Sequence, residues 1–137
     1  MITSPPSLVV AKLVETLGTR VLGTDLFVSV VPDEPESTIS LYDTLGTRGD
    51  KPMCASLDTP VRYGVQILAR SRDYTAMWTE LTTLCNSFES VDRLTITVGT
   101  DDYVITSIRI ESGPFFIGNS EQKESNVFSV NLQSSVR

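Results

Sequence analysis

The sequence contains no histidine among its 137 residues. Histidine is the commonest general base and the commonest metal ligand in proteins. Its absence means that a Ser–His or Cys–His nucleophile pair cannot form. The P-loop, GxGxxG, GxSxG and HExxH motifs are missing as well. The sequence therefore indicates no catalytic, cofactor-binding or metal-binding residues, and we expect no cofactor.

Cysteine is scarce, with only Cys54 and Cys85, which is too few for a zinc site. Cys85 falls on an apolar helical stripe, which predicts a buried free thiol. Cys54 lies in a loop-like region, and a Cys54–Cys85 disulfide is possible but unsupported. There is no secretory signal and no apolar run of membrane-spanning length. We therefore expect an intracellular, reducing compartment and no membrane partner.

Basic residues are few, at 11 against 17 acidic residues, and the net charge is −6. This balance argues against a general nucleic-acid binder, which needs a basic face to neutralise phosphates. The segment from Asp25 to Asp58 holds seven acidic and two basic residues, which accounts for most of the net charge. Such an acidic cluster is usually a solvated face. Its alternative role is to line a channel and repel DNA phosphates.

The strongest local pattern runs from Val61 to Phe88. Apolar residues alternate from Val61 to Ala69, which predicts a strand over Val61–Arg70 with one buried face. The period then changes to helical spacing. The predicted stripe comprises Tyr74, Met77, Trp78, Leu81, Leu84, Cys85 and Phe88. Ser71 or Asp73 is expected to cap this helix, and Trp78 is expected to anchor it in the core.

Weaker patterns predict one more helix and five more strands. The helix begins at Ser4-Pro5-Pro6, with Ser4 as cap, and stops at Gly18. The strands are Leu26–Val31, Thr38–Asp43, Leu94–Val98, Tyr103–Glu111 and Val127–Leu132. Val104, Thr106, Ile108 and Ile110 are expected to face the helices, as are Phe128, Val130 and Leu132. Pro32–Glu36, Thr44–Pro60 and Gly113–Asn126 are predicted to be loops, and Gly99–Asp102 a hairpin turn.

The order of these elements predicts a single α+β domain over residues 1–137. The expected architecture is a two-layer sandwich. A mixed or antiparallel sheet of about six strands forms one layer, and two helices pack on one face.

Several stretches of the chain resemble the tail terminator proteins of long-tailed bacteriophages. These proteins are also known as tail-completion, minor capsid or head–tail joining proteins. The stretches are LVVAKLVETLG, LFVSVVPDEP, ISLYDTLGTRGDKP, VRYGVQILARSRDY and SGPFFIGNSEQKESNVFSVNL. Two patterns typical of that family lie within them. A hydrophobic–Gln–hydrophobic strand leads through Arg70 to Tyr74, and a segment from Pro114 to Gly118 precedes a final strand over Phe128–Asn131.

This resemblance implies a structural virion protein without enzymatic activity. Such a protein forms a ring, commonly a hexamer, that caps the tail tube in the host cytoplasm, ends tube polymerisation and joins the tail to the head connector proteins. DNA passes through the ring without specific binding. On this hypothesis, the apolar loop Phe115, Phe116 and Ile117 contacts the tube or a neighbouring subunit. The candidate lumen residues are Asp33, Glu34, Glu36 and Asp50.

Other interpretations stay open. The chain could be a different neck component, or a monomeric module that binds a protein through Thr44–Pro60. A small enzyme using Arg70, Arg72 and nearby acids is the third alternative. The apolar loop could also simply fold over the open end of the core.

Overall fold

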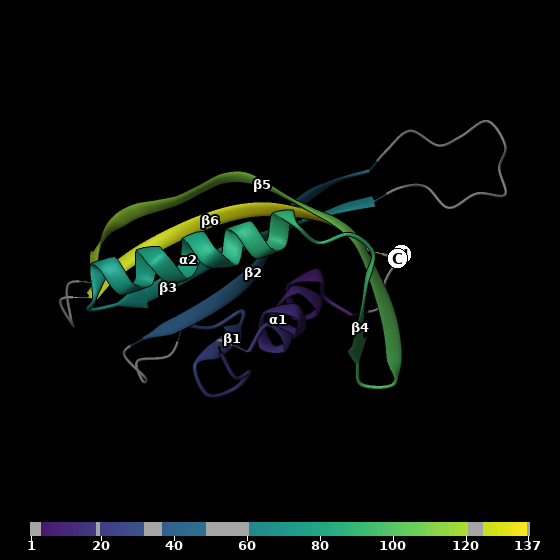
Figure 1. Cartoon of the computed structure of the whole chain (residues 1–137), viewed down its shortest axis with the longest axis horizontal. Helices are drawn as coiled ribbons and strands as arrows, with labels where there is room; N and C mark the ends of the chain where they lie inside the picture. The colour runs from purple at the N-terminus through teal and green to yellow at the C-terminus, as the bar shows by residue number, and fades with distance from the viewer. Residues whose placement is uncertain (1–3, 19, 32–36, 49–60, 121–124, 137) are drawn as a thin grey trace, which may run out of the picture.

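A computed structural model describes residues 4–18, 20–31, 37–48, 61–120 and 125–136. Its helices and strands follow the predicted order (Figure 1). They are α1 (Pro6–Thr16), β1 (Leu26–Val28), β2 (Thr38–Arg48), β3 (Val61–Ser71), α2 (Tyr74–Glu89), β4 (Leu94–Val98), β5 (Asp101–Ser120) and β6 (Ser125–Val136). Within the described chain, neither helix has the length and apolar character needed to cross a membrane.

The six strands form one mixed sheet in the order β1-β2-β3-β6-β5-β4. Strands β1 and β2 are parallel, and every other neighbouring pair is antiparallel. The sheet curls into a half-barrel, with β4 and the start of β5 bending round towards α1 (Figure 1). The predicted α+β class is confirmed. The finer two-layer sandwich packing stays a prediction.

Strand β3 lies in the middle of the sheet, and its alternation is confirmed. Val65, Ile67 and Ala69 are buried in one hydrophobic core cluster. The same cluster contains the predicted β6 residues Phe128, Val130 and Leu132 and the buried side chains of both helices. Burying both helices against this face supplies the main driving force for folding.

The predicted inward face of β5 is only half correct. Tyr103 and Ile105 are buried, whereas Val104 is only half-buried. The pairing with β6 shifts register between Ile105 and Ser107. A bulge of this kind inserts one residue and reverses which side chains face inward. After it, the even-numbered Ile108 is buried, as predicted.

Two predicted loops are shorter than expected. Strand β2 continues to Arg48, beyond the predicted end at Asp43. Strand β5 continues to Ser120, through most of the stretch predicted as a loop from Gly113 to Asn126. Further register shifts in β5 carry the pairing with β6 past residues that break simple alternation. Glycine and proline marked this segment as a loop, whereas pairing with a long neighbour keeps it extended.

The start of α1 is held by a residue from another strand. Its N-cap is Pro5, which has no side-chain cap bond, so the prediction that Ser4 caps the helix is wrong. The Asp43 carboxylate on β2 accepts bonds from both the backbone N–H and the hydroxyl of Ser7, each at 2.9 Å. The Ser4 hydroxyl accepts a bond from Tyr103 instead. A local capping signal is therefore replaced by a tertiary contact.

The start of α2 follows local rules. Asp73 is its N-cap, and its carboxylate accepts a bond from the backbone N–H of Ala76 at 3.0 Å. One of the two predicted caps is thus confirmed. At the end of α1, Gly18 has a φ of +83°, which ends the helix as predicted.

A buried arginine connects α2 to the start of β2. Arg20 is only 8% exposed and forms a forked ion pair with Glu80 on α2, at 2.8 Å to Oε2. Its guanidinium also donates to the carbonyl and the hydroxyl of Ser37, each at 2.9 Å. The planar fork thus satisfies acceptors from two elements at once.

We expect Arg20→Met to lower the free energy of unfolding by about 2–3 kcal/mol, measured by urea denaturation. Removing one partner of a buried ion pair is strongly destabilising, and the partial solvent access of Glu80 moderates the effect. The exposed Arg109 offers a matched control. Arg109→Met is expected to change stability by less than about 0.5 kcal/mol. Equal effects of the two variants would contradict this role for Arg20.

Candidate interaction surface

Four aromatic side chains gather where the first turns of α2 meet β5 and β6. The Tyr74 ring centroid lies 5.5 Å from that of Phe116 and 5.1 Å from that of Phe128. The Trp78 and Phe128 centroids are 6.2 Å apart. Phe128 is fully buried, whereas Tyr74, Trp78 and Phe116 are 46%, 40% and 43% exposed, respectively. This aromatic cluster therefore extends from the core to the surface.

The prediction that Trp78 is a buried core anchor is wrong. The buried stripe of α2 consists of Met77, Leu81, Leu84, Cys85 and Phe88. Trp78 lies at the border of this stripe, where one side of its ring contacts Phe128 and the rest meets solvent. Helical periodicity places a residue on the apolar side of the helix, but the curvature of the sheet decides how wide a stripe it covers.

Phe115, Phe116 and Ile117 belong to strand β5 and not to a loop, which corrects their predicted setting. They are 41%, 43% and 52% exposed. Phe116 pairs with the buried Phe128 and joins the aromatic cluster, whereas Phe115 pairs with Ser129 on the opposite face of the sheet. Phe116 thus both covers the end of the core and reaches the surface. Exposed apolar groups concentrated in this way are typical of interaction sites.

Gly113 allows Phe115 to lie close to strand β6. Its φ is +93°, and a Cβ atom built there would lie 2.5 Å from the Ser129 carbonyl oxygen and 3.3 Å from the Phe115 ring. Only glycine tolerates this backbone conformation and this close approach together. The residue therefore sets the position of Phe115 against β6.

The sheet face opposite the core cluster is called here the outer face. Cross-strand partners share a face, so the pairings place one row of residues across five strands. This row is Phe27, Ser40, Leu68, Ser129 and Phe115. A second row is Tyr42, Gln66, Asn131 and Ser112. Neither row contains a charged residue. Tyr42 also stays neutral, because its partial burial raises the pKa of its hydroxyl.

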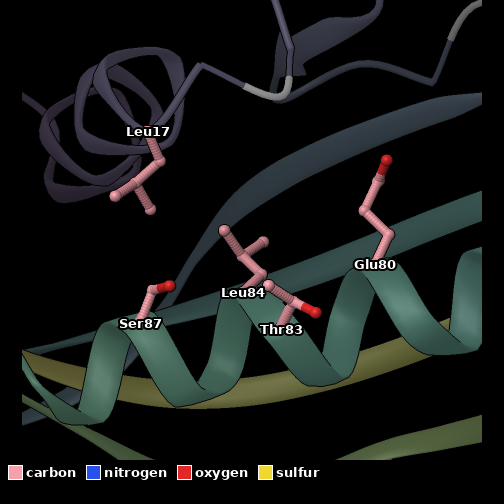
Figure 2. A pocket seen from close by; sticks show the side chains of 5 residues that line it. All are labelled: Leu17, Glu80, Thr83, Leu84 and Ser87. Carbon is pink, nitrogen blue, oxygen red and sulfur yellow. The ribbon is translucent and has the colours of Figure 1, made fainter.

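A small pocket lies between the end of α1 and the exposed side of α2 (Figure 2). Its volume is about 310 Å³, and it is lined by Leu17, Glu80, Thr83, Leu84 and Ser87. Leu17 points from α1 towards the α2 side chains. The only charged lining residue, Glu80, is paired with Arg20, so the pocket offers mainly apolar and hydroxyl contacts.

The groups with potential chemistry are placed apart. Arg70 is 8% exposed while Arg72 is exposed, so the two do not form one open cationic site. Within the part of the chain that the structure describes, no group of three or more acidic or cysteine residues could hold a metal ion. Cys85 is a buried free thiol, as predicted. Cys54 and the proposed lumen residues Asp33, Glu34, Glu36 and Asp50 lie outside the described residues, so their roles stay predictions.

The solvent side of α2 has an unusual composition that the periodicity of the helix does not reveal. Between Tyr74 and Phe88 the only charged residue is Glu80. Apart from Tyr74 and Trp78, the exposed positions of this stretch are occupied by Thr75, Ala76, Thr79, Thr82, Thr83 and Asn86. Surface helices normally carry charges on this side, so the lack of lysine and arginine was a readable signal.

Comparison with known proteins gives no family assignment: no protein-family model matches the chain, and neither does any curated protein. Function is therefore inferred from the features of the sequence and from the surface described above.

We expect Trp78→Ala to lower the free energy of unfolding by about 1–2 kcal/mol, because much of the ring is already exposed. Phe128→Ala is the matched comparison within the same cluster. It is expected to cost about 3–5 kcal/mol, because it leaves a cavity in the core. Urea denaturation measures both, and a loss for Trp78→Ala as large as that for Phe128→Ala would show that Trp78 is a core anchor after all.

Burial raises the pKa of the Cys85 thiol to about 11 from 9.0, with a smaller contribution from Glu89. Between these values the unfolded chain releases the proton while the folded chain keeps it, so stability falls as pH rises. In a Cys54→Ser background we expect this loss to reach about 2 kcal/mol from pH 9 to 11. Subtracting the same pH series for Cys85→Ala isolates the thiol. An unchanged difference across that range would show that Cys85 is solvated.

Proposed function

We propose that this protein is a structural virion protein, the tail terminator of a long-tailed bacteriophage. It forms a ring of six copies that caps the tail tube, ends tube polymerisation and presents its other face to the head connector proteins. In this proposal it is not an enzyme, it resides in the neck of the virion, and its six-stranded sheet and two helices pack as a two-layer sandwich.

The observation that carries the proposal is the group of exposed apolar side chains at this end of the sheet. Tyr74, Trp78 and Phe116 belong to the aromatic cluster, Phe115 lies on the opposite face of the sheet, and Ile117 follows Phe116 on β5. Each of these side chains is at least 40% exposed, and rigid aromatic groups predominate. Aromatic residues are enriched in protein interfaces because they provide large contact area at low entropic cost. A protein that must grip a tube end or a neighbouring copy needs a surface of this kind.

The incomplete edge of the sheet also supports assembly. Strand β4 pairs only with Asp101–Ile105 of β5, so in the described chain the rest of β5 pairs on one side alone. Several register shifts interrupt this open edge. Bulges protect an edge from uncontrolled strand addition. Side chains such as Phe116 and Ile117, rather than a continuous added strand, are then the natural contacts.

The net charge of −6 is compatible with DNA passing through a ring without sticking to it. In the proposal, Asp33, Glu34, Glu36 and Asp50 line the lumen. The main alternative is another neck-completion protein of the same virion. A monomeric protein-binding module is the second alternative, because the same exposed apolar surface could hold a single partner.

The test combines mass and tube capping. Light scattering of the wild type is expected to give a species near 90 kDa, or six copies of 15.0 kDa. Added to its polymerising tail tube protein, the wild type should stop tube growth and appear as a density at one tube end in electron micrographs. Tubes that grow to the same length without end density would refute the terminator role.

We expect Ile117→Asp to weaken capping roughly tenfold or more, since it removes an exposed apolar contact. Ile117 is more than half exposed, so the fold should be retained. Leu94→Asp, at a 37% exposed position on β4, is the matched control. Capping titrations that shift equally for both variants would remove Ile117 from the contact surface.

A further inference from the structure

The solvent side of α2 consists largely of residues that do not favour helix formation. It is defined here by Thr75, Thr79, Thr82, Thr83 and Asn86. Threonine is β-branched and has a lower helix propensity than the lysine, glutamate or alanine usual at exposed positions. The four exposed threonines on this sixteen-residue helix therefore increase neither the stability of the helix nor the solubility of the protein. Depletion of charge, with aromatic residues alongside, is the composition of an interface core.

The outer face of the sheet carries a row of apolar side chains. An antiparallel sheet that faces water normally carries polar side chains on that face. Here the first row carries Phe27, Leu68 and Phe115, with the small, buried Ser40 and Ser129 between them. In the described chain both helices belong to the core cluster on the other side, so this apolar row has no helix packed on it.

We propose that the solvent side of α2 in one copy packs on the outer face of the sheet in the next copy. Apolar sheet faces are normally covered by a helix. The α2 positions Thr75, Thr79, Thr82, Thr83 and Asn86 and the two outer rows carry no charge, so these parts of the two surfaces match. The nearest charges lie outside them: Glu89 is exposed in the last turn of α2, and Arg62 and Arg70 lie on the outer face of β3 beyond the two rows. A charged partner would leave desolvated charges unpaired against these uncharged positions, whereas a second copy places uncharged positions against each other.

The positions of the two surfaces determine the type of assembly. They lie on opposite sides of the same sheet, so the contact is head-to-tail. A two-fold dimer cannot satisfy both surfaces, because each docked pair still exposes one α2 and one outer face. Only a closed ring leaves neither unpaired. The inference therefore rests on the proposed ring and names the surfaces that close it.

The test uses one variant on each surface, with molecular mass as the readout. Thr82→Lys places a charge on α2 while raising helix propensity, so the fold should be kept. Phe115→Lys places a charge in the outer row, and Gln66→Lys is the substitute if circular dichroism shows that Phe115→Lys is unfolded. Each variant alone is expected to stay at 15.0 kDa, whereas the control Thr95→Lys on β4 should assemble like the wild type.

Mixing the two variants gives the decisive result. The Thr82→Lys copy keeps an intact outer face, and the Phe115→Lys copy keeps an intact α2. A head-to-tail contact therefore predicts that an equimolar mixture forms one good junction. Its mass should be near 30 kDa, or two copies of 15.0 kDa, and no larger species should appear.

The possible outcomes separate this inference from the proposed function. If Thr82→Lys still forms the wild-type ring, the contact is wrong while the ring remains. If the mixture stays monomeric although each variant is folded, the contact is not head-to-tail, and the inference fails. If the wild type is monomeric at every concentration, α2 is not a self-association surface. Tube capping then decides the terminator role on its own.

Discussion

The burial of one face of β3 and β6 against both helices is the constraint on which the rest of the molecule depends. Val65, Ile67 and Ala69 lie opposite Leu132, Val130 and Phe128 in the middle of the sheet. Shifting either strand by one residue would turn these side chains away from the core. The curl of the sheet, the place of α2 and the positions of the exposed side chains all follow from this packing.

Contacts between distant segments complete the structure around that core. Asp43 on β2 holds the start of α1, and Arg20 joins α2 to the start of β2. These polar groups do not drive folding, because the attraction within a buried ion pair offsets little more than the free energy needed to remove its charges from water. They fix the positions of the helices relative to the sheet, and so decide which side of α2 meets solvent.

That placement creates the surfaces on which the proposed function depends. The apolar residues at the end of β5 and the threonine-rich side of α2 are costly for an isolated molecule, since exposed surface that is apolar or poor in charge promotes association. Both become advantageous in an assembly. The proposed ring would use the aromatic cluster, the threonine-rich side of α2 and the apolar outer row together, whereas a monomeric module would use only one such surface.

The sequence by itself determined the order of the elements and most of their core residues. Alternation in β3 and helical spacing in α2 are local patterns, and local patterns survive folding. Only the tertiary structure decided that Trp78 is half exposed, that the inward face of β5 reverses at Ser107, and that Asp43 rather than Ser4 caps α1. Each depends on how strands of distant sequence pair and curl, which no spacing within one segment encodes. For the same reason, the match between α2 and the outer face emerged only once the pairings had aligned Phe27, Leu68 and Phe115 in one row.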